Sequence, residues 1–133
     1  MNIKQIDHLG IAVKNLDEGI KAYEALGFKC THKETVAEQK VNTATLPIGE
    51  AILELLEPTE ANSAVGKFLA DQGGGLHHIA IRVENIEEKL QELKNKGIRL
   101  IDETPRIGVG GSKVAFIHPK STLGTLVELV ERA

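Results

Sequence analysis

What this chain of 133 residues lacks excludes several classes of protein. Its single cysteine, Cys30, cannot form an internal disulfide, which is typical of a reducing compartment, and we expect it to pack in a strand rather than act as a nucleophile. No apolar run approaches the roughly 20 residues that cross a bilayer, and the N-terminus lacks the apolar stretch of a signal peptide. The formal net charge is −3, without the basic cluster of a nucleic-acid-binding protein. We therefore expect a cytoplasmic protein whose partners include neither membrane nor nucleic acid.

One segment of the sequence occurs twice. Residues 7–18 match residues 77–88, with His8 on His78 and each pair 70 positions apart. With 41% hydrophobic and 26% charged residues, the chain can form one domain or two small modules that share one core. The repeat favours two related modules.

Each half of the sequence predicts a strand, then a helix, then three short strands. In the first half the strand covers residues 5–13, and Asn15 is placed to cap the following helix, with Glu18 in capping-box position. Gly27 suits the left-handed position that ends this helix. The second half repeats the plan with a strand at 76–83, a cap at Asn85 and a stop at Gly97. The short strands are expected at residues 28–36, 41–47 and 50–57, and at residues 98–103, 113–118 and 124–131.

These elements predict an α+β fold of two βαβββ modules, at residues 1–58 and 76–133, in a pseudo-twofold arrangement. The linker at 59–75 includes an expected short helix at residues 63–69. It ends in a glycine triplet that is either a flexible joint or a phosphate cradle, although the Walker-type lysine and serine do not follow it. The loop at residues 108–112 is too long for a two-residue turn and is either functional or a plain mobile hairpin loop.

Two histidines and two glutamates give the main functional signal. His8 and His78 are related by the repeat, while Glu54 and Glu128 each interrupt an apolar run, where an unpaired carboxylate is costly. Two symmetry-related halves can bring these side chains to a shared axis, and two imidazoles with two carboxylates suit a borderline divalent metal. Four protein ligands leave about two positions of an octahedron open, which indicates a catalytic ion that assists proton removal next to a carbonyl. Outer, surface or packing positions are expected for the other histidines, His32, His77 and His118.

Several stretches resemble a known family. The segment from Gly73 to Ala80 together with His118–Ser121 is the most specific, and the others are residues 7–13, 38–39, 46–49, 52–58 and 105–108. Across essentially the whole chain these stretches resemble the vicinal oxygen chelate (glyoxalase / bleomycin resistance / dioxygenase) superfamily, and most closely its methylmalonyl-CoA epimerase family. The resemblance implies a curved, partly closed eight-stranded sheet and metal-dependent epimerisation of methylmalonyl-CoA by α-proton abstraction through an enolate.

The resemblance also implies roles for individual residues. It makes His8, His78 and Glu128 metal ligands and places Glu54 at a ligand position that is glutamine in some members. The implied ion is divalent, cobalt first, with nickel, manganese or zinc as alternatives. An acyl-CoA substrate and a homodimer are the implied partners.

Epimerisation needs a proton removed from one face of a carbon and returned to the other, which two acid/base groups do most simply. The resemblance places Glu38 and Glu128 in these roles, with a solvated turn residue as the other interpretation of Glu38. Lys120 and Arg106 are candidates for contacting the anionic groups of the substrate, with exposed salt bridges as the alternative.

Two other functions stay open. Bacterial glyoxalase I (lactoylglutathione lyase) uses a His, Glu, His, Glu ligand set, which Glu54 would complete. A non-enzymatic binding module of the same superfamily lacks such ligands. We see no second basic cluster for the carboxylates of glutathione, which favours the epimerase.

Overall fold

The computed structural model describes residues 3–133, which divide into two compact units. The first unit is residues 8–77, and the second unit combines residues 3–7 with residues 78–133. Residues 1 and 2 of the expected first module lie outside the described residues. The expected module boundaries, 1–58 and 76–133, describe the duplication of the sequence and stay a prediction.

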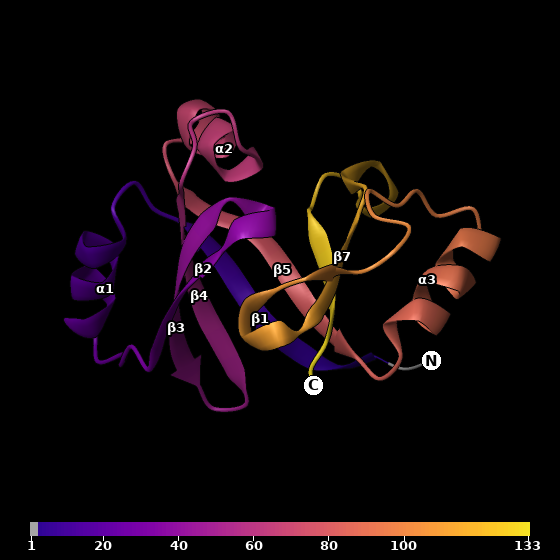
Figure 1. The fold of residues 1–133 in the computed structure, drawn as a ribbon, viewed down its shortest axis with the longest axis horizontal. Coiled ribbons are helices and arrows are strands. Elements are labelled where there is room, and N and C mark those ends of the chain that lie inside the picture. The colour runs from indigo at the N-terminus through magenta and orange to yellow at the C-terminus, as the bar shows by residue number, and fades with distance from the viewer. Residues whose placement is uncertain (1–2) are drawn as a thin grey trace. The chain divides into compact units, whose positions relative to one another are not determined.

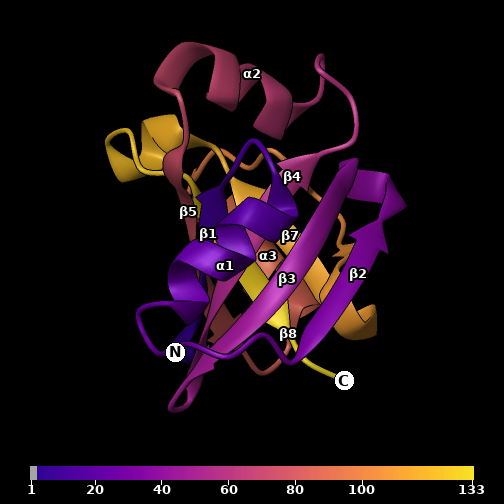
Figure 2. The ribbon, with the colours of Figure 1, turned by 90° about the vertical axis from the view of Figure 1, so that its left-hand side faces the viewer.

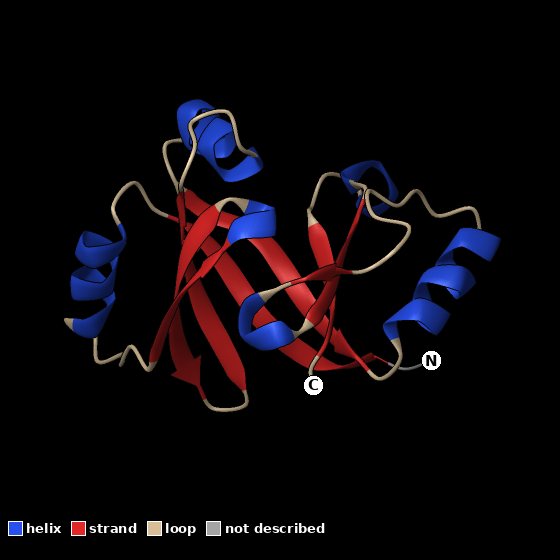
Figure 3. Cartoon of the chain, in the orientation of Figure 1, coloured by secondary structure: helices blue, strands red, loops and turns tan. Residues whose placement is uncertain are grey.

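The elements follow the βαβββ order in both halves of the chain (Figure 3). The first half contains β1 (Ile3–Ala12), α1 (Leu16–Glu24), β2 (His32–Val36), a 3-10 turn η1 (Ala37–Gln39), β3 (Val41–Ile48) and β4 (Ala51–Pro58), followed by the connecting helix α2 (Ala64–Gln72). The second contains β5 (Gly75–Val83), α3 (Ile86–Asn95), β6 (Arg106–Ile107), the turn η2 (Val109–Gly111), β7 (Lys113–Ile117), the turn η3 (Pro119–Thr122) and β8 (Val127–Glu131).

The strands confirm the predicted α+β class and the eight strands. The strand order is β2-β3-β4-β1 in the first unit and β1-β5-β8-β7-β6 in the second, because β1 has residues in both. In each unit the first and last strands of a βαβββ sequence, β1 with β4 and β5 with β8, pair in parallel. Such a parallel pair needs a crossover connection, which α1 and α3 begin.

Each unit packs its helix on its own strands. Helix α1 lies against β3 and β4 (Figure 2), and its buried Leu16 joins Leu46 and Leu55 in one apolar cluster. Helix α3 lies against β7 and β8 (Figure 1), where Ile86 and Leu90 pack on Leu129. Of the helices in the described part of the chain, none has the length and apolar character needed to span a membrane.

Both helices begin with the expected cap. The side chains of Asn15 and Asn85 accept hydrogen bonds from the backbone N–H groups of Glu18 and Glu88, at 2.9 and 3.0 Å. The glycines expected near the helix ends, Gly27 and Gly97, have positive φ, and Gly97 follows the C-cap directly.

A second side-chain hydrogen bond caps the start of each helix, and the sequence did not predict it. The Glu57 carboxylate accepts from the Leu16 N–H at 2.9 Å, and the Glu131 carboxylate accepts from the Ile86 N–H at 2.8 Å. A carboxylate at a helix N-terminus satisfies an orphan donor and complements the helix dipole. Each glutamate therefore ties the last strand of its half to the helix of that half.

The strand expected at residues 98–103 was wrong. This segment makes only an isolated bridge between Leu100 and Ile117, and β6 lies further along, at Arg106–Ile107. The N–H groups of Ile101 and Asp102 both donate to the carbonyl of Phe116, while the Asp102 carboxylate accepts from the Phe116 N–H at 2.8 Å. The Asp102 side chain thus replaces a backbone carbonyl as the acceptor for the Phe116 N–H. A regular β-ladder therefore cannot continue through this segment.

The Glu131→Ala variant tests the helix tie. Loss of the carboxylate leaves the Ile86 N–H without its acceptor and should lower the free energy of unfolding by about 1 kcal/mol. Glu131→Gln keeps an oxygen acceptor and should retain most of the stability. Urea denaturation measures both.

The matched control is Glu84→Ala, which removes an exposed ion pair to Lys4 of 3.6 Å. Exposed pairs contribute little, so its cost should stay below about 0.5 kcal/mol. Equal losses in Glu84→Ala and Glu131→Ala would contradict the assignment.

Candidate functional site

The first unit holds a buried histidine beside a buried glutamate. His8 on β1 and Glu54 on β4 are 4% and 5% exposed, with the His8 Nε2 atom 3.8 Å from the Glu54 Oε1 atom. The strands pair in parallel with Gly10 opposite Glu54, so His8 lies two residues before the register partner of Glu54. Because side chains alternate along a strand, an even offset sends both to one face of the sheet.

The second unit repeats this arrangement. His78 on β5 and Glu128 on β8 are 4% and 2% exposed, and the Nε2 and Oε1 atoms are 3.1 Å apart. Ala80 lies opposite Glu128, which is the same register as Gly10 opposite Glu54. The expected histidine and glutamate of each half therefore come together within that half.

An aromatic ring fixes the second histidine. Phe116 lies opposite Glu128 in the β7–β8 ladder, and its ring meets the His78 imidazole edge to face, with centroids 5.4 Å apart and planes at 86°. This geometry favours one orientation of the imidazole. Phe116 was not among the residues expected from the sequence, because a phenylalanine in an apolar strand carries no functional signal.

The donor types of these pairs fit a metal ion. Imidazole nitrogens and carboxylate oxygens are ligands of borderline divalent metals, and His8, His78 and Glu128 are candidate ligands that are all buried. Burying ionisable groups is expensive unless charge and hydrogen bonding are compensated. A divalent cation supplies that compensation for carboxylates and leaves the neutral imidazoles as donors.

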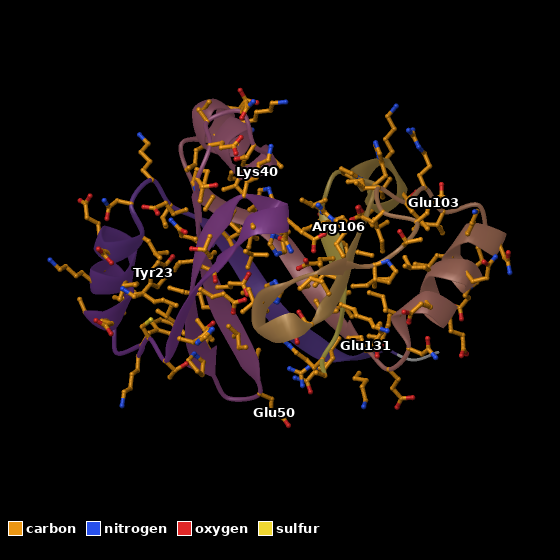
Figure 4. The ribbon with its side chains drawn as sticks, in the orientation of Figure 1. Tyr23, Lys40, Glu50, Glu103, Arg106 and Glu131 are labelled. Atoms are coloured by element: carbon orange, nitrogen blue, oxygen red, sulfur yellow. The ribbon has the colours of Figure 1, made fainter. Side chains whose placement is uncertain are left out.

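Arg106 lies close to the second pair. It is on β6, with its Nε atom 3.2 Å from the Asp102 carboxylate and its guanidinium carbon 5.9 Å from the centroid of the Phe116 ring. Arg106, labelled in Figure 4, therefore stacks on the ring that contacts His78. Arg106 and Asp102 form an ion pair, although the Arg106 Nε atom has no hydrogen-bond partner among the described residues.

The other two expected residues, Glu38 and Lys120, are exposed. Glu38 is in η1, a turn closed by Lys40, which has a positive φ of 55° and donates its N–H to the Ala37 carbonyl (Figure 4 labels Lys40). Lys120 is in η3, where its backbone N–H donates to the His118 Nδ1 atom at 3.1 Å.

The remaining histidines lie as expected, outside the two pairs. The His77 ring packs edge to face on Phe68 with centroids 5.0 Å apart, and exposed His32 lies 2.9 Å from the Glu34 carboxylate. Their roles are local packing and hydrogen bonding.

An ionic cluster that the sequence did not predict lies next to the motif histidine. Asp7 is fully buried in the second unit and accepts hydrogen bonds of 2.9 Å from the Nε atoms of both Arg82 and Arg132. An aspartate directly before a motif histidine, on an apolar strand, is the signal that could have indicated a buried partner. Its arginines were not recognisable, because they are 75 and 125 residues away in the chain.

Comparison with known proteins gives the family. The model of the Glyoxalase/Bleomycin resistance protein/Dioxygenase superfamily matches residues 7–116. The uncharacterized protein YqjC of Bacillus subtilis is 47% identical over 130 residues, which are 97% of this chain and 93% of that one. The ethylmalonyl-CoA/methylmalonyl-CoA epimerase of Cereibacter sphaeroides is 33% identical, over 96% of this chain and 97% of that protein.

Solved structures agree. A variant of the Streptomyces coelicolor methylmalonyl-CoA epimerase, in complex with 2-nitronate-propionyl-CoA, is 42% identical with a TM-score of 0.95, covering 98% of this chain and 96% of that one. The match therefore extends over nearly the whole of both chains. This chain belongs to the methylmalonyl-CoA epimerase family of the Glyoxalase/Bleomycin resistance protein/Dioxygenase superfamily.

Proposed function

We propose that this epimerase acts on methylmalonyl-CoA, by metal-dependent removal and return of the α-proton. The observation that carries the proposal is the pair of equivalent, buried His–Glu pairs in a chain that is similar to methylmalonyl-CoA epimerases over nearly its whole length. Buried ionisable pairs that recur at the same register have a functional rather than a packing origin, because apolar residues would fill the same space at lower cost.

The four side chains His8, Glu54, His78 and Glu128 are proposed to hold one divalent ion. Cobalt is the first choice, with nickel, manganese or zinc as alternatives, because nitrogen and oxygen donors do not select strongly among these ions. A bound divalent ion would supply a Lewis acid that stabilises negative charge on the carbonyl oxygens of the substrate.

Two carboxylates are proposed to move the proton. Glu128 is buried beside His78, and Glu38 is exposed on the turn between β2 and β3, so the two groups have different environments. One carboxylate takes the α-proton from one face of the carbon, and the other carboxyl group donates a proton to the opposite face. The planar enolate between these events has lost its configuration, which is what epimerisation requires.

Two cationic side chains are proposed to contact the anionic groups of the substrate. Arg106 forms an ion pair with Asp102 and lies over Phe116, so its charge lies beside the ring that contacts His78. Lys120 is exposed and can reach a phosphate group as a mobile point charge. We also expect a homodimer in solution.

Glu54 supports a second candidate, glyoxalase I. A carboxylate beside His8 completes a set of two histidines and two glutamates and adds a negative charge that weakens the metal as a Lewis acid. Both reactions begin with proton removal next to a carbonyl, so the substrate distinguishes them. Turnover of methylmalonyl-CoA without turnover of the hemithioacetal of methylglyoxal and glutathione supports the epimerase, and the reverse result replaces it.

The His78→Ala variant tests the metal site. Loss of one imidazole ligand should lower the metal content by about tenfold or more, because even the loss of an outer hydrogen-bond partner costs that much at metal sites. Elemental analysis after dialysis against cobalt measures the content. The control is His77→Ala. His77 is adjacent to His78 in the sequence, but its ring packs on Phe68, so this variant should keep the wild-type metal content. Wild-type content in folded His78→Ala would exclude His78 as a ligand.

The Glu38→Gln variant tests the second acid/base group. The amide keeps the size of the side chain but cannot accept a proton, so turnover should fall by roughly 10²- to 10⁴-fold while metal content stays unchanged. Each enantiomer of methylmalonyl-CoA is assayed separately. Glu50→Gln, at another exposed glutamate in the β3–β4 turn (Figure 4), is the control and should behave as wild type. Near-normal turnover of both enantiomers by Glu38→Gln would make Glu38 a turn residue only.

A further inference from the structure

The glycine-rich loop at residues 108–112 has a defined conformation built around one carbonyl oxygen. The Val109 carbonyl accepts from the Ser112 Oγ atom at 2.9 Å and from the Ser112 N–H at 3.3 Å, and the Gly108 N–H donates to the Ser112 carbonyl at 2.9 Å. Gly110 and Gly111 have positive φ, and a Cβ atom at Gly108 would lie 2.7 Å from a methyl group of Val114. The loop therefore has its own hydrogen bonds and a packed glycine at its start.

One side chain from outside the loop reaches the same carbonyl. Arg132, directly after β8, donates from its NH1 atom to the Val109 carbonyl at 3.3 Å. Its Nε and NH2 atoms donate to the two carboxylate oxygens of Asp7, at 2.9 and 2.5 Å. The planar guanidinium thus makes a bidentate pair with a fully buried carboxylate and uses a third nitrogen to hold the loop.

The loop lies between two residues of the proposed site. On one side it follows β6, which carries Arg106, and on the other it leads into β7, which carries Phe116. Arg106 stacks on Phe116, and Phe116 contacts the His78 ring. A displacement of the loop therefore moves Arg106, the cation proposed to bind the substrate, while the β7–β8 ladder keeps Phe116 in place.

We infer that Arg132 is a positioning residue, which ties the Val109 carbonyl to buried Asp7 and so holds Arg106 where it binds the anionic substrate. This role rests on the proposed function. It predicts that loss of the tie weakens substrate binding through Arg106 and leaves the metal ligands in place, because His78 and Glu128 lie on the paired strands β5 and β8 rather than on the loop.

Arg82 supplies the matched control. Its Nε atom donates to Asp7 at 2.9 Å. Arg82→Ala and Arg132→Ala both remove an arginine from the same carboxylate, but only Arg132→Ala also removes a donor from the Val109 carbonyl. Both variants should have a lower free energy of unfolding than the wild type. The difference between the two variants measures the contribution of the hydrogen bond from Arg132 to the Val109 carbonyl.

The first readout is hydrogen–deuterium exchange of the peptide that covers residues 106–116, which needs no activity. Exchange should rise in Arg132→Ala and stay at the wild-type rate in Arg82→Ala. The second readout is the kinetics with methylmalonyl-CoA and saturating cobalt. KM should rise about threefold to tenfold in Arg132→Ala, the effect of one hydrogen bond, with kcat and metal content within twofold of wild type.

If Arg132→Ala does not fold, Arg132→Lys takes its place. A lysine can keep the charge opposite Asp7, but its single nitrogen cannot reproduce a bidentate pair and a separate donor to Val109. Loop exchange should still rise in this variant.

Unchanged loop exchange in the folded Arg132 variant, or an equal rise in Arg82→Ala, would overturn the tie. Raised exchange with an unchanged KM would overturn the positioning role. If wild-type protein turns over no malonyl thioester while the exchange difference holds, the proposed function fails and the tie itself stands.

Discussion

The cost of burying a carboxylate beside an imidazole is the constraint on which this structure depends. Glu54 and Glu128 lie almost fully buried in strands whose neighbouring residues are leucine and valine. Such positions are normally apolar, and an uncompensated charge there would cost several kcal/mol. Both halves of the chain place a histidine against the glutamate at the same register. A divalent cation held by the imidazoles and carboxylates would compensate this charge.

The duplication makes residues of the two halves equivalent. Some equivalent residues make the same contacts in both halves, and others make different ones. The glutamates that hold the helix starts, Glu57 and Glu131, are equivalent like the site pairs. Asp7 and His77 occupy equivalent positions but have unrelated partners, two arginines for Asp7 and a phenylalanine ring for His77. The ionic anchor of the glycine-rich loop thus lies in the second unit.

The sequence predicted most of the fold because its signals were local or repeated. The caps at Asn15 and Asn85 each join residues three positions apart, and the pairing of His8 with Glu54 follows from alternation on two adjacent strands. Features that depend on distant side chains were missed. The Asp102 carboxylate interrupts the ladder expected at residues 98–103, and Arg132 reaches Asp7 across 125 positions. Neither contact leaves a periodic pattern, so no rule of spacing could reveal it.

The central claim is that a metal held by this chain promotes removal of the α-proton of methylmalonyl-CoA. The most direct measurement is solvent-deuterium exchange at that carbon, followed by proton NMR, with protein depleted of metal and with the same protein after addition of cobalt. The account predicts loss of the α-proton signal well above the buffer rate with cobalt, and little exchange after metal depletion. Exchange at the buffer rate with cobalt, nickel, manganese and zinc alike, or rapid exchange that does not depend on added metal, would contradict it.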